Sequence, residues 1–314
     1  MYSSILISPQ HFEYIGLLGF AIPFFMLGNI ILMFITWFNK ARSKWLFTFL
    51  TFIAWPFYGT IYQFRSNTEE GSKGIKILSY NVKWFVDARG DNYDEVINWI
   101  NDQEADILCF QEFYPLKGIE DRLGEGYYTS IDKEEFHTAI FSKYPILNEG
   151  LLFEKSELNN IRFVDLRVRE DTIRVYNLHL QSMGIQPNKI NRSEPKQAEI
   201  EEIGIRFTSA SQVRSRQMNR LIDHMSSTDL PMVVVGDFND IPFSNNYFKL
   251  RSMLRNAFEE KGNGFGATFN NKIPFLRIDH QFFSEDIDIL DFKTMNGIFY
   301  SDHFPLIGIY DLTH

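Results

Sequence analysis

Residues Met232 to Asp240 read Met-Val-Val-Val-Gly-Asp-Phe-Asn-Asp, an apolar β-branched run that changes abruptly to polar side chains. The run predicts a buried strand, because valine favours the pleated backbone and the run is too short for a helix. Asp237 and Asn239 stand two residues apart and share one face if the strand continues, although Gly-Asp-Phe-Asn-Asp is also an ordinary turn sequence. The stretch therefore predicts a core strand that ends in functional groups or in a turn.

Similar polar clusters stand at the ends of other short β-rich runs. They are Ser79-Tyr-Asn81, Gln111-Glu112, Asn177-Leu-His179, Arg277-Ile-Asp-His280 and Ser301-Asp-His303. Singly, each has an ordinary structural explanation, such as a solvated strand end for Glu112 or a core histidine for His179. Together with the Asp237 cluster they are improbable as coincidences, so we expect them to converge on one surface.

The runs between these clusters predict the fold class. Predicted strands are Ile75 to Val82, Ile107 to Phe110, Ala139 to Ser142, Arg162 to Val168, Ile173 to Leu180, Met232 to Gly236, Asp279 to Phe283 and Leu306 to Tyr310; helical patterns cover Tyr93 to Asn101 and Ser209 to Met225. Many short strands with few long helices predict an α+β or α/β sandwich with its helices outside the sheets. Residues 182–208 have mixed charge and no clear period, so we expect a long surface loop or a loosely packed insertion there.

The motifs, taken in this order, resemble those of the endonuclease/exonuclease/phosphatase superfamily, which includes pancreatic deoxyribonuclease, abasic-site endonucleases, neutral sphingomyelinases and inositol-polyphosphate phosphatases. The resemblance spans residues 74–314, and Gly-Asp-Phe-Asn with Ser-Asp-His is its most specific part. Residues 262–268 and 139–145 resemble the membrane-anchored bacterial members. The resemblance implies a four-layer sandwich of the α/β (α+β) class, two mixed β-sheets flanked by helices, with the site at one edge.

The residue types suit hydrolysis of a phosphate ester with a divalent cation. Mg²⁺ or Mn²⁺ prefers oxygen ligands, and we expect Glu112 to be the first ligand, with Asn81 and Asp302 completing or supporting the shell. Zinc is disfavoured, because the sequence has neither a Cys cluster nor a paired-His spacing. We therefore expect a magnesium-type cofactor.

The resemblance also implies catalytic roles. Asp237 would accept a proton from the attacking water, with Asn239 orienting it, and His179 and His303 would donate hydrogen bonds to the phosphoryl oxygens. Asp279 would pair with His303, fixing its tautomer and favouring its charged form. The general base is then either Asp237 or the His303–Asp279 pair, and the sequence does not choose between them.

Two neighbours of Asp279 have open assignments. Arg277 stands two residues before Asp279 and either contacts a substrate phosphate or forms a surface salt bridge. His280 directly follows Asp279, and adjacent residues of a strand point to opposite faces. We therefore leave His280 out of the predicted site.

Two uncharged apolar stretches precede the catalytic region. Ile15 to Phe38 has 24 residues and Trp45 to Phe64 has 20, and each is long enough to cross a hydrocarbon core of about 30 Å. Neither shows the polar face that helices of a soluble hairpin keep. We therefore predict an anchor of residues 1–65 with transmembrane helices at about 15–38 and 45–64, a polar linker at 66–74 and a catalytic domain at 75–314.

Charge predicts the orientation of this anchor. The loop between the two stretches holds Lys40, Arg42 and Lys44, whereas residues 1–14 hold no basic side chain. Positive loops stay on the cytoplasmic side. Two spans then place the catalytic domain outside the cytoplasm, on a cytoplasmic (inner) membrane of the bacterial type; an undetected third span or a start codon placed too late would invert this.

Composition limits the partners. Residues 66–314 hold 27 basic and 39 acidic side chains, a net charge of −12, which argues against a broad basic groove for a nucleic-acid duplex. A lipid headgroup or a small phosphodiester is the favoured substrate, an extracytoplasmic nuclease is the alternative, and a non-catalytic binding module is disfavoured. The 45% hydrophobic content excludes a disordered chain, and Cys109, the single cysteine, is expected to be a core residue of a monomer.

Overall fold

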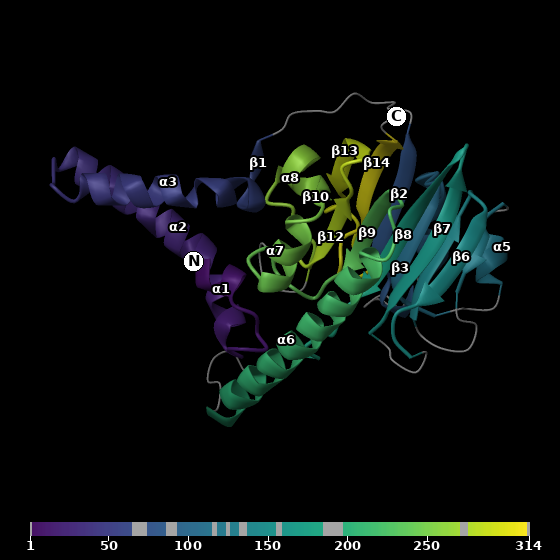
Figure 1. The fold of residues 1–314 in the computed structure, drawn as a ribbon, viewed down its shortest axis with the longest axis horizontal. Coiled ribbons are helices and arrows are strands. Elements are labelled where there is room, and N and C mark those ends of the chain that lie inside the picture. The colour runs from purple at the N-terminus through teal and green to yellow at the C-terminus, as the bar shows by residue number, and fades with distance from the viewer. Residues whose placement is uncertain are drawn as a thin grey trace.

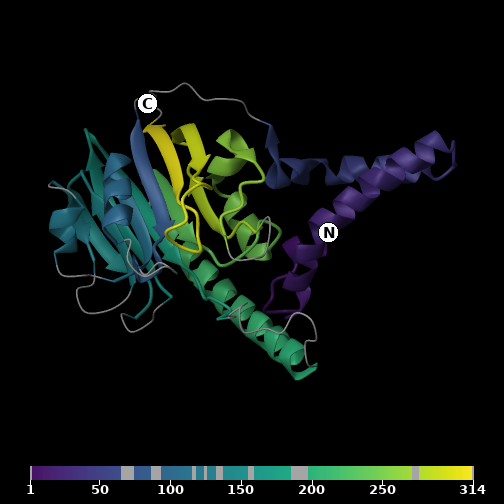
Figure 2. The same ribbon diagram turned by 180° about the vertical axis from the view of Figure 1, so that it is seen from behind.

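The computed structural model describes residues 2–64, 74–85, 93–114, 118–123, 126–131, 137–154, 159–184, 197–270 and 276–312. Two six-stranded sheets lie face to face (Figures 1 and 2). In spatial order the first holds β10 (Arg255–Asn256), β12 (Asp279–Phe283), β9 (Met232–Asp237), β8 (Asp171–His179), β7 (Ile161–Val168) and β6 (Ile146–Leu151). The second holds β13 (Ile287–Thr294), β14 (Leu306–Leu312), β2 (Ile75–Asn81), β3 (Ile107–Phe113), β5 (His137–Ser142) and β4 (Tyr128–Ser130).

Helices cover the outer faces of both sheets. Helix α4 (Tyr93–Asp102) and the short α5 (Ile119–Arg122) pack on the second sheet, and α6 (Gln197–Met225) and α7 (Asn245–Arg251) pack on the first. A single turn, η1 (Lys83–Phe85), follows β2, and α8 (Ala257–Lys261) follows β10. A buried apolar cluster that includes Cys109 fills the space between the two sheets. The layers therefore run helix, sheet, sheet, helix, which confirms the predicted four-layer sandwich.

Both sheets are mixed, and this places polar strand ends side by side. Strand β2 runs parallel to β3, and β8 runs parallel to β9, whereas the other pairings are antiparallel. Parallel neighbours end at the same edge of a sheet. The carboxyl ends of these four strands carry the clusters that the sequence singles out, so those clusters meet at one edge of the sandwich.

The predicted strands are all present, but residues 182–208 are not one loop. Helix α6 already begins at Gln197, while residues 185–196 lie outside the described part of the chain. Phe207 and Ser211 of α6 are buried, and a Cβ added at Gly16 would stand 3.0 Å from the Phe207 ring. The apolar period was missed because this helix packs partly on the N-terminal segment, which the sequence assigned wholly to the membrane.

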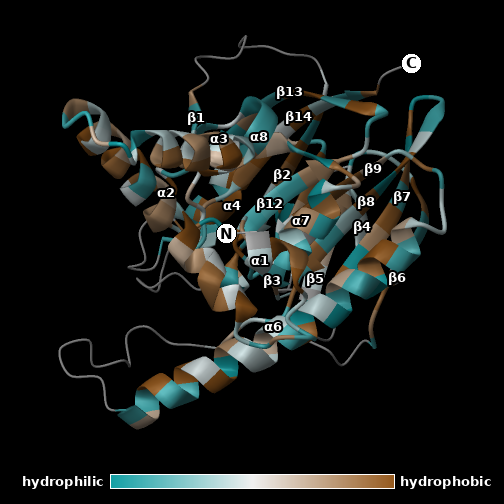
Figure 3. Ribbon diagram, turned by 60° about the vertical axis from the view of Figure 1, so that its left-hand side comes forward, coloured by the Kyte–Doolittle hydropathy of each residue, from teal (hydrophilic) through white to brown (hydrophobic). Residues whose placement is uncertain are grey.

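The N-terminal segment forms α1 (Tyr2–Leu6), α2 (Ile15–Phe38) and α3 (Lys44–Ile61). Helices α2 and α3 make a hairpin that projects from the sandwich and is largely hydrophobic (Figure 3). Within the described residues, α2 is the one helix long and apolar enough to cross a membrane. The second span therefore remains a prediction.

The segment after α3 differs from the predicted span of residues 45–64. The helix ends at Ile61, because Tyr62 is extended with φ −145°, and β1 (Gln63–Phe64) then pairs with β11 (Asn263–Gly264) of the catalytic region. Most of the predicted linker lies outside the described residues. The N-terminal segment is thus hydrogen-bonded to the sandwich before that linker begins.

Candidate active site

The candidate site lies where β2, β3, β8 and β9 end and β12 begins. Asn81, Glu112, His179 and Asp237 come from the ends of these strands, and Asp279 opens β12 beside Asp237 in the antiparallel register. His303 comes from the segment before β14 and forms an isolated bridge with Phe269. Residues separated by more than 200 positions are thereby gathered at one edge.

Local backbone geometry explains the sequence around Asp237. Gly236 has φ +133°, and a Cβ there would stand 2.1 Å from the backbone oxygen of Leu178, so only glycine lets β9 approach β8 this closely. Asn239 and Glu112 have φ of 48° and 49°, in the left-handed region that non-glycine residues rarely adopt. Such strain concentrates at functional sites.

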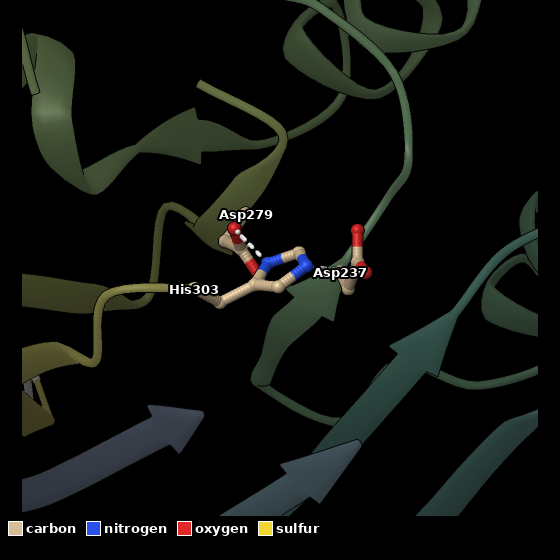
Figure 4. Close-up of side chains that lie close together, drawn as sticks. All are labelled: Asp237, Asp279 and His303. Atoms are coloured by element: carbon tan, nitrogen blue, oxygen red, sulfur yellow. Dashed lines mark hydrogen bonds and ion pairs between the residues drawn. The ribbon is translucent and has the colours of Figure 1, made fainter. Parts of the chain in front are cut away.

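Asp279, His303 and Asp237 form a line through the imidazole ring (Figure 4). Nδ1 of His303 lies 2.9 Å from Oδ2 of Asp279, and Nε2 lies 3.7 Å from Oδ2 of Asp237. The Oγ1 of Thr268 accepts the backbone N–H of Asp279 at 3.1 Å, which anchors the carboxylate from behind. The predicted pairing of Asp279 with His303 is therefore present in the structure.

Burial sets the protonation of this line. Desolvation raises the pKa of Asp237 to about 6, an effect that neighbouring Asp279 reinforces and His303 and His179 oppose. For His303, burial disfavours the charged form, but the carboxylates of Asp279 and Asp237 outweigh it and raise the pKa to about 10. Around neutral pH the imidazole is thus charged, and Asp237 is mostly ionised and close to its proton-accepting range.

Asn81 links the line to Glu112. Its Nδ2 donates to Oδ2 of Asp237 at 3.0 Å and to Oε1 of Glu112 at 3.2 Å. Nε2 of His179 lies 3.7 Å from Oε1 of Glu112 and 4.0 Å from Oδ2 of Asp237. The predicted ligands Asn81 and Glu112 thus adjoin the predicted catalytic residues His179 and Asp237 directly.

Two predicted residues have other partners. The side chain of Asn239 donates to the backbone oxygen of Leu180 at 3.0 Å, while its own N–H donates to Oδ1 of Asp237 at 2.8 Å. Asp302 pairs instead with Lys83, whose Nζ lies 2.6 Å from Oδ2. Asn239 therefore supports Asp237 through the backbone, and Asp302 is held by a cation of the chain itself.

The donor set fits a hard divalent cation. Glu112 is a quarter exposed, which gives a cation and its waters access to an oxygen ligand. Asn81 turns its amide nitrogen toward Glu112, and its amide oxygen accepts the backbone N–H of Lys83 at 3.1 Å, so this side chain would have to rotate to offer its oxygen to the cation. Donor atoms of Asp237, Asp279 and His303 also lie within 4.8 Å of one another among the described residues. A cation there would compete with the Asp279–His303 hydrogen bond, so the Glu112 side is the better place.

Several supporting residues were outside the predicted set. Nε2 of Gln111 donates to Oδ1 of Asn177 at 2.6 Å, and this buried pair joins β3 of one sheet to β8 of the other. The Asn159 amide nitrogen lies 3.3 Å from Nε2 of His179. Gln111 and Asn177 stand in the clusters that the sequence marked, and Lys83 follows Asn81 by two residues, whereas nothing local in the sequence marks Asn159.

Arg277 fits neither of its predicted assignments. It is buried, its guanidinium donates to the backbone oxygen of Thr60 at 2.5 Å, and it lies over the Phe258 ring at 3.8 Å. His280 points away from the catalytic line, as expected, with Nε2 3.1 Å from the backbone oxygen of Asp240. Both residues therefore belong to the supporting structure.

This arrangement agrees with comparisons at the family level. The sequence model described as the Endonuclease/Exonuclease/phosphatase family matches residues 78–303. The chain belongs to the endonuclease/exonuclease/phosphatase family. A second model, described as a domain of unknown function (DUF8431), matches residues 1–61, and a search of curated proteins finds no match.

Solved structures of family members share the fold. An endonuclease/exonuclease/phosphatase family protein of Bacteroides thetaiotaomicron is 19% identical with a TM-score of 0.57, covering 76% of this chain and 99% of its own. The mannosyl-6-phosphatase of the same species is 18% identical with a TM-score of 0.56, covering 76% and 100%. Humanised D. rerio TDP2 is 14% identical with a TM-score of 0.56, covering 76% and 100%. Family membership makes this chain a hydrolase of the phosphoester class.

Proposed function

We propose that this protein is a Mg²⁺- or Mn²⁺-dependent hydrolase of phosphate esters held at a membrane by its N-terminal helices. The observation that carries the proposal is the buried line Asp279–His303–Asp237 with Glu112 and Asn81 beside it. It combines a charged donor, a carboxylate with a raised pKa and, in Glu112, a partly exposed carboxylate ligand at one edge. Hydrolysis of a phosphoester uses each of these.

Asp237 is the proposed general base. Its raised pKa of about 6 lets it accept a proton from the attacking water and release it near neutral pH. His303 is charged below pH 10 and therefore cannot accept that proton, so the Asp279–His303 pair is the proposed donor to a phosphoryl oxygen. The electrostatics thus support one of the two assignments that the sequence left open.

The remaining residues position substrate and water. His179 has a ring nitrogen between Glu112 and Asp237, where it is placed to donate to a second phosphoryl oxygen. Asn239 holds Asp237 in its orientation through the N–H bond to Oδ1. These contacts keep the water and the phosphorus in fixed positions relative to the base.

Glu112 and Asn81 are the proposed ligands of the divalent cation, and Asp302 would join them only after release from Lys83. When bound, the cation supplies charge stabilisation to the phosphoryl group and the leaving oxygen.

The domain is proposed to lie outside the cytoplasm, because the loop holding Lys40, Arg42 and Lys44 is positively charged. A reporter fused after Thr313 is then active only in its extracytoplasmic form.

The test is a hydrolysis screen of the full chain in lipid nanodiscs. Substrates are p-nitrophenyl phosphate, bis-p-nitrophenyl phosphate, plasmid DNA, sphingomyelin and a phosphoinositide, each with Mg²⁺, with Mn²⁺ and with EDTA. We expect EDTA to abolish hydrolysis, and Glu112→Gln to raise the Mg²⁺ concentration needed for half-maximal rate. Glu149→Gln, an exposed carboxylate on β6, is the matched control. Full activity in EDTA would end the metal assignment, and no hydrolysis of any phosphoester would end the proposed function.

A further inference from the structure

The N-terminal hairpin packs directly beneath the catalytic strand ends. Ile22 and Met26 of α2 and Phe57 of α3 share one buried apolar cluster with residues that flank the catalytic line. Those flanking residues are Ile241 and Phe243 after Asp237, Ile278 before Asp279 and the partly buried Phe269, whose ring lies 5.1 Å from that of His303. Each acidic or basic member of the line thus has a chain neighbour or ring partner that contacts the hairpin's core.

Helix α2 approaches the catalytic loop, residues 237–243, closely at a glycine. A Cβ at Gly19 would stand 3.0 Å from Cδ1 of Ile241 and 3.2 Å from the backbone oxygen of Phe243. One turn earlier, a Cβ at Gly16 would stand 3.0 Å from the ring of Phe207 on α6. By contrast, Gly28, farther along α2, has no neighbour within 4 Å of such a Cβ. Of these three glycines, only Gly16 and Gly19 in the first turns of α2 therefore lie against the catalytic domain.

The end of α3 is bound to the other side of the same region. Arg277, two residues before Asp279, donates to the backbone oxygen of Thr60, and Oγ1 of Thr60 donates to Oε1 of Glu259 at 3.0 Å. Gln63 donates to the backbone oxygen of Glu259 at 2.7 Å, beside the β1–β11 pairing. Polar bonds at α3 and apolar packing at α2 thus hold the hairpin on both sides of the catalytic loop.

The level of these contacts follows from the length of α2. Its 24 residues extend about 36 Å, whereas a hydrocarbon core is about 30 Å thick. A span by α2 therefore leaves only about one turn outside the core. Gly16 lies in that turn and Gly19 directly follows it, so their partners Phe207, Ile241 and Phe243 lie at the boundary between the headgroups and the hydrocarbon core.

Aromatic side chains mark two levels along the hairpin. At the distal end, the rings of Trp37 and Trp45 lie 5.3 Å apart, and Nζ of Lys44 stands 4.7 Å from the Trp37 ring. At the base, the exposed rings of Phe12 and Tyr14 precede α2 and that of Phe64 follows α3. The exposed ring of Phe265, which comes after β11, lies 4.9 Å from the ring of Tyr62 at the end of α3. Aromatic residues of this kind gather at the two interfaces of a bilayer.

We propose that the N-terminal hairpin is a positioning element of the active site: it fixes the catalytic loop in the headgroup layer of the bilayer, within reach of phosphoesters carried by membrane lipids. This inference rests on the proposed phosphoester hydrolysis. In this proposal the hairpin holds the catalytic domain rigidly against the bilayer. The substrate is then a lipid of the leaflet that faces the site. Gly19 and Arg277 are then positioning residues that act through the segments carrying Asp237 and Asp279.

A pair of glycine variants tests whether the hairpin positions the catalytic loop. Gly19→Leu inserts a side chain where Ile241 and Phe243 leave no room, whereas Gly28→Leu adds the same side chain to an open face of the same helix. In nanodiscs we expect Gly19→Leu to lower kcat at least about tenfold with KM within about threefold, because the catalytic loop moves while substrate still docks. Gly28→Leu should match the wild type, and equal kcat for both variants would overturn the proposal. Gly19→Ala is the milder variant if Gly19→Leu does not fold.

The level of the site has its own measurement, which does not depend on activity. Single cysteines replace Phe265, at the base of the hairpin, and Glu149, on β6 at the far edge of the sandwich (Figure 1), in a Cys109→Ala background. Each carries a fluorophore in nanodiscs with headgroup-attached quencher. We expect strong quenching at position 265 and little at 149. Equally weak quenching at both would overturn the proposed position of the site at the lipid headgroups.

The substrate arm compares one headgroup in two forms. A long-chain phosphate ester embedded in the nanodisc is set against its short-chain, water-soluble analogue below its micelle concentration. We expect kcat/KM for the embedded form to exceed that for the soluble form at least about tenfold, because the hairpin holds the site at the headgroups of the leaflet. Equal values would overturn the proposed lipid substrate but leave the proposed hydrolase activity standing. If neither form and no screened ester is hydrolysed, the proposed function itself is wrong.

Discussion

Nδ1 of His303 lies 2.9 Å from Oδ2 of Asp279, both side chains being buried. The same ring presents Nε2 to Oδ2 of Asp237 at 3.7 Å. An imidazole flanked by two carboxylates keeps its proton and its orientation, so it donates rather than accepts. The chemistry proposed for the site depends on this one ring.

A double-mutant cycle separates orientation from direct action. We expect His303→Ala to lower kcat by at least about 10²-fold, because a preorganised donor is lost. The His303→Ala, Asp279→Ala double variant should be little slower than His303→Ala alone, since a carboxylate that only orients the ring has nothing left to orient. Steady-state kcat of the three variants, with circular dichroism as the folding control, measures this. Fully additive losses would give Asp279 a separate role in metal or substrate binding.

The pH profile of kcat/KM should have two limbs. Asp237 accepts a proton only when ionised, so the rate falls about tenfold per unit as the pH drops below about 6. His303 donates only when charged, so the rate falls again above about pH 10. Initial rates across this range measure both limbs, and a profile that stays flat well below pH 6 would show that Asp237 is not the base.

The sequence predicted the strands and the convergence of their ends because both rest on local patterns. Val233, Val234 and Val235 read as a core strand, and the repetition of polar clusters after such runs indicated that they converge on one surface. The family motifs then supplied the order in which the strand ends meet. Asp237, Asp279 and His303 accordingly lie side by side in the structure.

Long-range contacts were beyond the sequence. The Lys83–Asp302 pair joins residues 219 positions apart, and Arg277 finds its partner at Thr60, inside a segment that composition assigns to the membrane. Neither residue carries a local signal of its partner. The sequence did not predict the N-terminal half of α6 for the same reason, because Phe207 packs against α2.

Gly236 should be the least replaceable glycine of the catalytic region. Gly236→Ala places a methyl group 2.1 Å from the backbone oxygen of Leu178 at φ +133°, so we expect a loss of at least about 3 kcal/mol in the free energy of unfolding. Gly204→Ala is the matched control, because this helical glycine has open space around it and the change should stabilise by about 0.5–1 kcal/mol. Urea unfolding of the detergent-solubilised chain measures both, and equal effects would contradict the strand geometry.

His280 should make the fold sensitive to acid. Its ring is fully buried, Nε2 faces the backbone oxygen of Asp240 at 3.1 Å, and Nδ1 has no hydrogen-bond partner among the described residues. Burial, with the nearby charge of Arg277, lowers its pKa to about 3, while the bond to Asp240 opposes the shift. An unfolded histidine titrates near 6.5, so between pH 3 and 6.5 the unfolded chain binds one proton more than the folded chain.

Stability from this group is therefore fully present above pH 6.5 and is lost as the pH falls, by about 2 kcal/mol between pH 7 and pH 5. Asp237 and His303 have raised pKa values and bias the curve in the opposite direction, so the whole-protein slope does not isolate His280. The difference between wild type and His280→Gln does, because glutamine keeps a donor for the oxygen of Asp240 and does not titrate. We expect His280→Gln to lose about 2 kcal/mol less than the wild type between pH 7 and pH 5 in urea unfolding. Parallel pH curves for the two proteins would mean that His280 titrates in the folded chain as it does in the unfolded chain.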